Sequence, residues 1–168
     1  MSFIEPSAVD AIATEVAALP ASRIPIEMGR ASREQPDLLA FILGSTEGMA
    51  PGMSELAGFI YFVIWRVFRA QTRGKMNHVT GDAIQRKLEA NELSLASLDG
   101  TDPQTIDDEL VARLTGQPAV FAYMIEAITG AEEDEDEPVV MSPEEKGALV
   151  LLLKTAIDVL DDARSEAA

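Results

Sequence analysis

The sequence contains no cysteine and a single histidine among its 168 residues. Without cysteine, the chain can form no disulfide and offers no thiolate to a metal ion or to a covalent mechanism. The lone His78 excludes metal sites and proton relays that need two imidazoles. Neither a G-x-S-x-G element nor a phosphate-binding loop with its lysine occurs. The sequence therefore predicts no catalytic residue, no metal site and no cofactor.

Long hydrophobic runs are also missing. The longest strongly apolar stretch, LAGFIYFVIW (56–65), ends at Arg66 and is too short to span a bilayer. The N-terminal residues lack the basic region of a secretory signal and include Glu5, Asp10 and Glu15. We therefore expect a cytoplasmic protein in which LAGFIYFVIW forms a buried helix.

Positive charge is scarce, and the formal net charge is −16. Residues 1–77 carry 7 basic and 8 acidic side chains, whereas residues 78–168 carry 6 and 21. A strongly acidic chain repels polyanions, so we expect binding neither to nucleic acid nor to anionic membranes. The excess negative charge belongs almost entirely to the second half.

Helix-forming residues are abundant, and apolar residues recur at helical spacing, which predicts an all-α fold in one domain spanning 1–168. Two helices open with the same step, Gln35-Pro36 and Gln117-Pro118, and proline suits the first helical position. The expected helix caps are Ser7, Ser54, Thr80 and Ser142.

Several segments are expected to interrupt the helices. Residues 21–34 contain Pro25 and Gly29 and predict a polar connection with at most one short helical turn. Gly44 is expected to end the helix that begins at Pro36, and a loop then runs to Met53. The helix that follows is apolar on nearly all sides, which predicts a central position, and Arg73-Gly74-Lys75 is expected to close it.

The two halves of the sequence also match each other. Asp10-Ala-Ile corresponds to Asp82-Ala-Ile, Gln35-Pro to Gln117-Pro, and Met53-Ser to Met141-Ser, with offsets of 72, 82 and 88. We predict two related three-helix units, 7–75 and 80–166, that share one core. The second unit would hold an extra helix at about 103–115 and an acidic loop at 131–138. HEAT-like packing serves as an analogy of shape.

The strongest candidate for a binding site is a basic stripe near the end of the central helix. No acidic residue occurs between Leu56 and Gly81. The candidate residues are Arg66, Arg69, Arg73 and Lys75, with Tyr61 and Trp65 beside them. The three arginines are spaced i, i+3 and i+7, which places them on one face of a helix. Such a stripe can also simply complement the helix dipole.

In the second unit, equivalent positions carry the opposite charge. At an offset of 89, Arg69 corresponds to Asp158 and Arg73 to Asp162, with Asp161 alongside. These groups could pair between the halves of one chain or across a symmetric dimer. A third possibility is that the arginines hold an anionic small molecule or an acidic peptide.

Two loops are candidate partner contacts. The first is the Pro-Gly segment flanked by Met49 and Met53, because mobile methionines suit adaptable surfaces. The second is the acidic run Glu132, Glu133, Asp134, Glu135, Asp136 and Glu137. Adjacent acids of this kind do not form a cation cage, and we expect a solvated loop or a contact for a basic partner.

These features favour a non-catalytic protein–protein interaction module, such as an adaptor or regulator, that forms a homodimer. One alternative is an acidic inhibitor or immunity-type protein that binds a basic partner. Another is a ligand-binding protein or enzyme with a pocket between the two units, lined by Tyr61, Trp65, Arg66 and Arg69.

Overall fold

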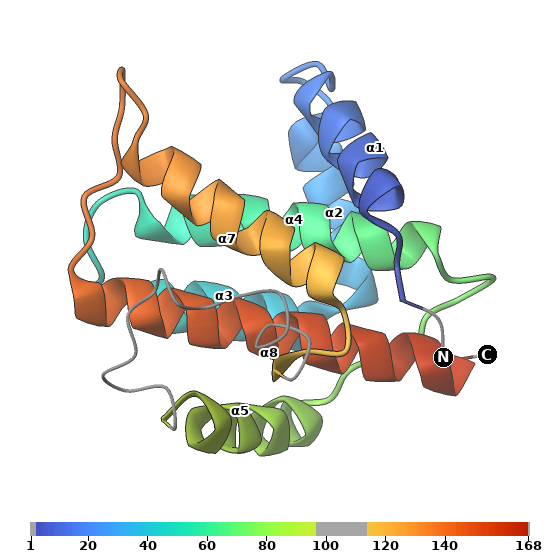
Figure 1. Ribbon diagram of the computed structural model, residues 1–168. Coiled ribbons are helices and arrows are strands. Elements are labelled where there is room, and N and C mark those ends of the chain that lie inside the picture. Colours follow the sequence, from blue (N-terminus) through green and yellow to red (C-terminus); the bar gives the residue numbers. More distant parts are fainter. Residues whose placement is uncertain (1–2, 97–113, 168) are drawn as a thin grey trace.

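A computed structural model describes residues 3–96 and 114–167, and helix is the only regular secondary structure in this part of the chain. The helices are α1 (Pro6–Ala17), α2 (Ile24–Glu34), α3 (Pro36–Thr46), α4 (Met53–Ala70), α5 (Gly81–Ala96), α7 (Pro118–Glu132) and α8 (Pro143–Ala167) (Figure 1). The prediction of an all-α fold is confirmed. Most of the extra helix predicted at about 103–115 lies outside the described residues.

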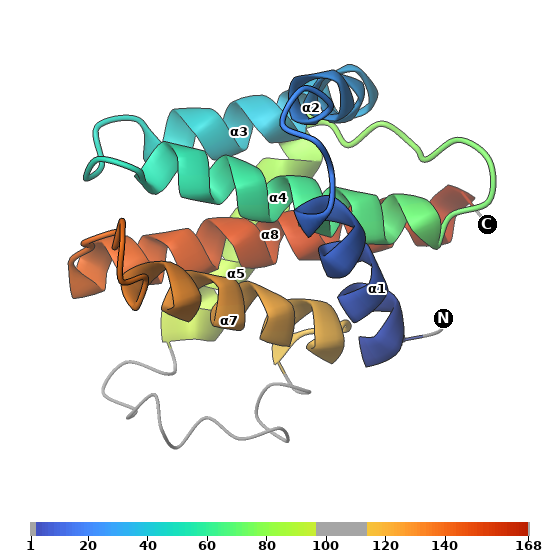
Figure 2. The ribbon, with the colours of Figure 1, turned by 90° about the horizontal axis from the view of Figure 1, so that it is seen from above.

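α4 is the central helix, as its composition predicted. Eleven of its residues are buried, and it packs against α1, α2, α3, α7 and α8. α4 and α8 contact each other, and each of them also contacts both α3 and α7. Figure 2 shows these four helices running alongside one another. The main hydrophobic core therefore lies between α4 and α8 and is closed by α3 and α7 on either side.

Two further helices, α1 and α5, cover this four-helix arrangement from different sides. α1 packs on α4 and α7, whereas α5 packs on α8 and α3 (Figures 1 and 2). α2 contacts α3 and α4 and lies next to the C-terminal half of α4. None of the described helices is long and apolar enough to cross a membrane.

Some predicted helix starts are confirmed and others are wrong. Thr80 caps α5 by accepting the Ala83 N–H at 3.2 Å, and Ser142 forms a reciprocal capping box with Glu145 at 3.1 Å in both directions. Ser7 and Ser54 instead lie inside α1 and α4. Proline in the first turn already sets the start of α1, and α4 begins after a glycine with positive φ.

The predicted breaks between helices need three corrections. Residues 24–34 form a complete helix because Pro25 falls in its first turn, where no N–H is needed. α3 continues past Gly44 to Thr46, whose hydroxyl bonds back to the Ile42 carbonyl at 3.0 Å. The loop is thus confined to residues 47–52, where Gly48 and Gly52 adopt φ values of 84° and 86°. α4 ends at Ala70, ahead of the predicted closing residues.

The two Gln-Pro steps do open helices, and their glutamines are buried. The Gln35 side-chain oxygen accepts the Val79 N–H at 2.8 Å, just before α5 begins. The Gln117 side-chain oxygen accepts the Ile4 N–H at 2.8 Å, just before α1 begins. Each glutamine therefore anchors the chain that leads into a helix of the other half.

Candidate functional site

An open crevice of about 600 Å³ lies between α1, α2 and the C-terminal half of α4. We call it the arginine crevice. It is lined by Ile12, Glu15, Glu27, Arg30, Arg33, Glu34, Trp65, Arg66, Arg69, Ala70 and Lys75. Its size is in the range of sites that hold small ligands or peptide side chains. The candidate residues Trp65, Arg66, Arg69 and Lys75 are thus brought together.

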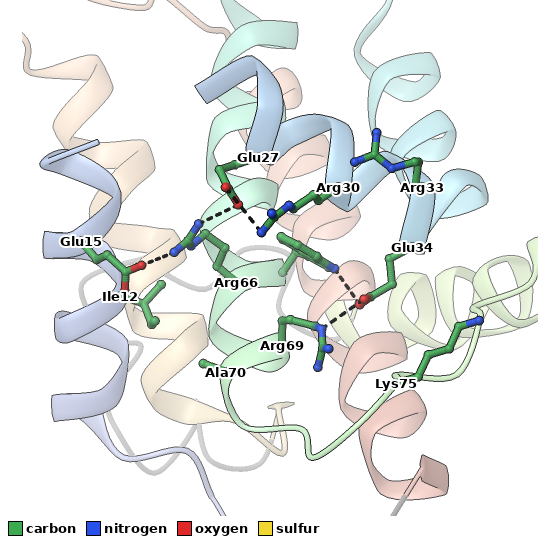
Figure 3. A pocket seen from close by; sticks show the side chains of 11 residues that line it. Ile12, Glu15, Glu27, Arg30, Arg33, Glu34, Arg66, Arg69, Ala70 and Lys75 are labelled. Carbon is green, nitrogen blue, oxygen red and sulfur yellow. Dashed lines mark hydrogen bonds and ion pairs between the residues drawn. The ribbon is translucent and has the colours of Figure 1, made fainter. Parts of the chain in front are cut away.

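Arg66 lies at the centre of the crevice. Its guanidinium forms ion pairs with Glu15 of α1 and with Glu27 of α2, the latter at 3.3 Å (Figure 3). The same group lies 5.9 Å from the centroid of the Phe62 ring, one helical turn earlier. Only 17% of the Arg66 side chain is exposed. Arg66 therefore joins three helices and has little freedom to move.

Glu27 is the buried acceptor of the crevice, with 8% of its side chain exposed. Besides Arg66, it contacts Arg23 at 3.2 Å and Arg30 at 3.7 Å. A buried carboxylate is costly unless it is paired, and here guanidinium groups approach both of its oxygens. This arrangement explains why an acidic residue is tolerated on the inner face of α2.

Glu34, at the end of α2, organises the other side of the crevice. Its carboxylate accepts a hydrogen bond from the Trp65 indole N–H at 3.1 Å and pairs with Arg69 Nε at 3.2 Å (Figure 3). Because Trp65 and Arg69 are one turn apart on α4, a single carboxylate fixes both side chains.

Two cations of the crevice lack an acidic partner within the described residues. Arg33 and Lys75 form no ion pair there, and Arg30 makes only the 3.7 Å contact with Glu27. The lining thus holds five basic side chains against three acidic ones, in a protein whose net charge is −16. Such a site favours a carboxylate or another oxyanion, which guanidinium groups bind with paired hydrogen bonds.

The crevice is not the pocket predicted between the two units. All its walls come from the first half of the chain, and Tyr61 does not line it. Tyr61 is buried in the core, where its hydroxyl has no hydrogen-bond partner among the described residues. Burial, together with the nearby Glu34 charge, raises the pKa of Tyr61 above its ordinary value. Arg73 is exposed and lies outside the lining.

The predicted pairing of these arginines with aspartates inside one chain is wrong. Arg66 and Arg69 are paired with glutamates of α1 and α2, as described above. Asp158 pairs with Lys154 at 2.7 Å, Asp161 with Arg164 at 2.9 Å, and Asp162 with Lys87 at 3.1 Å. Each of these aspartates therefore pairs with a cation of α8 itself or of the neighbouring α5. Pairing across a dimer stays a prediction.

The structure buries one of the two methionines predicted to form an adaptable surface. Met53 is fully buried at the start of α4, and Met49 packs partly against the core. The site prediction for Met53 is therefore corrected to a packing role, whereas that for the half-buried Met49 stays a prediction.

The acidic run has an ordered turn and an exposed surface. Glu132 ends α7 and pairs with Lys146 at 2.7 Å, whereas residues 133–137 are exposed. The Asp134 carboxylate accepts the N–H groups of Asp136 and Glu137, both at 2.9 Å, and these bonds lower the pKa of Asp134. The Val139 N–H then bonds to the Ala131 carbonyl at 2.9 Å and closes the loop.

Sequence reasoning missed the acidic half of the crevice, Glu15, Glu27 and Glu34. They come from segments far from the arginines in sequence, and one of these segments was predicted to be a connection. The usable signal is the spacing of Glu27, Arg30 and Glu34, which places all three on one face once residues 24–34 are recognised as a helix.

The chemistry of the crevice suits binding. Its described lining contains cations, carboxylates and apolar groups and no hydroxyl, thiol or imidazole. No group of three or more potential metal ligands occurs among the described residues. Comparisons with known protein families, curated proteins and solved structures found no match for this chain. The function has to be inferred from the side chains themselves.

Proposed function

We propose that this protein is a non-catalytic protein–protein interaction module whose arginine crevice binds an acidic segment of a partner. The observation that carries the proposal is the gathering of five basic side chains in one crevice of a strongly acidic protein. Two of them, Arg33 and Lys75, have no acidic partner in the described part of the chain.

The crevice divides into a rigid floor and an available rim. Arg66 and Arg69 are held by Glu15, Glu27 and Glu34, so their geometry is set before any partner arrives. Arg33, Lys75 and the exposed Arg30 side chain form the rim. Incoming carboxylates would pair with the rim and need not displace the ion pairs of the floor. A preorganised floor lowers the entropy cost of binding.

A titration with acidic peptides tests this proposal. A fluorescent peptide with several glutamates should bind the protein, and the matched glutamine peptide should not. Arg33→Gln should weaken binding roughly tenfold, which is about 1.4 kcal/mol. Arg86→Gln removes the same charge from an exposed arginine on α5 and should leave the affinity unchanged. Equal losses in the two variants, or equal binding of both peptides, would count against the crevice.

We also infer that the chain consists of two related helical units, α1–α3–α4 and α5–α7–α8. Exchanging α1 with α5, α3 with α7 and α4 with α8 reproduces the pattern of contacts among these six helices. The two Gln-Pro steps support the same inference, since each glutamine anchors the chain before the first helix of the opposite unit. In a crystal structure, one rotation of about 180° should superpose all three helices of the first unit on those of the second. If each of the three helix pairs needed a different rotation to superpose, a common origin of the two units would be contradicted.

A further inference from the structure

We propose that the acidic segment bound by the arginine crevice is residues 133–137 of a second copy of this chain. This inference rests on the proposed function and names its partner. It predicts a homodimer in which the connection between α7 and α8 of one copy enters the crevice of the other.

The connection has the chemistry that the crevice requires. Its five consecutive acidic residues, Glu133 to Glu137, are exposed and make no ion pair with a described residue. The carboxylate of Asp134 is used to order the turn, so the other four side chains are presented on a defined backbone. An ordered ligand loses less entropy on docking than a flexible tail does. Charge is complementary, since the loop carries only acids and the crevice has a basic excess.

The loop cannot reach the crevice of its own chain. Its Val139 side chain lies against Gly52, which immediately precedes α4, and Glu145 of the following helix accepts the Ala50 N–H at 2.8 Å. The crevice lies at Trp65–Ala70, near the other end of α4, about 20 Å away at 1.5 Å per residue. Both ribbon views place the α7–α8 connection and α1 at opposite ends of the bundle (Figures 1 and 2).

A dimer with a two-fold axis lets the loop of each copy reach a crevice and leaves neither crevice empty. Two copies that lie side by side in opposite directions place each loop beside the crevice of the partner, which closes the assembly as a dimer. Both contacts are then equivalent, and two modest ionic contacts act together. The remaining surfaces of the two acidic chains repel, so the contact is local and specific.

Charge reversal tests the inference on the full chain. The crevice variant carries Arg33→Glu with Lys75→Glu, and the loop variant carries Glu133→Lys, Glu135→Lys and Glu137→Lys. Asp134 is left intact because it holds the turn. The control carries Asp10→Lys, Asp82→Lys and Glu92→Lys, which reverse three exposed acids on α1 and α5. Circular dichroism checks that every variant is folded, and sedimentation gives its mass.

The wild-type chain and the control should dimerise, whereas the crevice and loop variants should each be monomeric. An equimolar mixture of the two monomeric variants should form a heterodimer, because each crevice then meets a loop of opposite charge. A wild-type chain that stays monomeric up to about 1 mM would overturn the inference. If the crevice variant or the loop variant still dimerised, the dimer would use another interface and the inference would also be overturned.

The acidic-peptide titration separates this inference from the proposed function. If the chain is monomeric but the glutamate peptide binds in a manner that depends on Arg33, the crevice still recognises acidic partners and only the second copy is excluded. If neither peptide nor second copy binds, both proposals fall. Binding of a basic peptide to the wild-type loop, with no self-association, would support an acidic inhibitor in place of a dimer.

Discussion

Gln35 and Gln117 occupy the same structural position in two different helices. Each precedes a proline that opens its helix, and their backbone angles are nearly equal, at φ −132°, ψ 67° and φ −133°, ψ 75°. Both side chains are buried, and both accept a backbone N–H, from Val79 and Ile4 respectively. A backbone N–H that is buried without water needs such a partner.

We predict that Gln35→Ala and Gln117→Ala each lower the free energy of unfolding by about 1–3 kcal/mol, because each leaves a buried N–H unsatisfied. Gln85→Ala is the matched control, since Gln85 is exposed on α5 and its side chain bonds, among the described residues, only to Glu89. It should change stability by less than about 0.5 kcal/mol. Urea denaturation measures all three values. A Gln35 variant as stable as the control would show that water replaces the amide.

A buried ion pair within α8 is hydrogen-bonded to Asn91 of α5. The Lys154 side chain is 3% exposed, and its ammonium donates to Asp158 and to Asn91, both at 2.7 Å. The Asn91 amide also donates to Asp158 at 3.0 Å. Three polar groups therefore satisfy one another inside an apolar contact between two helices.

We predict that Asp158→Asn destabilises the fold by about 3–5 kcal/mol, because it leaves the Lys154 charge buried without a counter-ion. Asp162→Asn is the control on the same helix. Its carboxylate is 57% exposed and pairs with Lys87, so its loss should cost at most about 1 kcal/mol. Thermal unfolding followed by circular dichroism compares them. Equal shifts in Tm would mean that the Lys154 charge has reached solvent.

Alkaline pH should unfold the protein through its two tyrosines. Burial raises the pKa of Tyr123 to about 12 and shifts the pKa of Tyr61 in the same direction. In the unfolded chain both would ionise near pH 10. The folded state then binds more protons than the unfolded state, so stability is full below pH 10 and falls as pH rises above it.

Titration of tyrosinate absorbance and of helical circular dichroism on one sample measures this effect. The native protein should show little tyrosinate at pH 10, and ionisation should then coincide with loss of helix. Tyr61→Phe should move unfolding to higher pH, because it removes one group whose ionisation favours the unfolded state and whose hydroxyl has no partner in the described structure. Full ionisation of both tyrosines without any loss of helix would contradict the assigned burial.

Local patterns in the sequence predicted the parts of the fold that depend on neighbouring residues. The apolar run around Trp65 identified the central helix, and Pro36, Pro118 and Ser142 marked three helix starts. Pro25 and Gly29 misled because both residues usually break helices, yet in α2 the proline falls in the first turn. A helix that packs on α3 and α4 tolerates one glycine, since tertiary contacts outweigh its propensity.

The arginine crevice was only half predictable for a similar reason. Arg66 and Arg69 stand out because acids are absent around them. Their actual partners, such as Glu15 and Glu27, lie on two earlier helices, and only the packing of α1 and α2 against α4 brings them together. The offset between the halves pointed instead to Asp158. Positions that align between two halves of a sequence do not have to touch, because each faces its own neighbours.

Stability and binding should separate within the crevice. Glu27→Gln removes the buried counter-ion of Arg66, and we expect it to lower the free energy of unfolding by about 1–3 kcal/mol. This is less than a fully buried pair would lose, because Arg23 and Arg30 are about half exposed and can turn to water. Glu55→Gln, at an exposed site on α4, is the control and should change stability by less than about 0.5 kcal/mol.

Arg33→Gln should leave stability unchanged while it weakens peptide binding, because Arg33 has no ion pair in the described structure to lose. Urea denaturation gives the stability, and peptide titration the affinity, of the Glu27→Gln, Glu55→Gln and Arg33→Gln variants. A Glu27 variant that unfolds earlier but still binds the peptide would identify Glu27 as part of the floor. If Arg33→Gln instead destabilised the fold as much as Glu27→Gln, Arg33 would belong to the scaffold, and the crevice would have no free rim with which to hold an acidic partner.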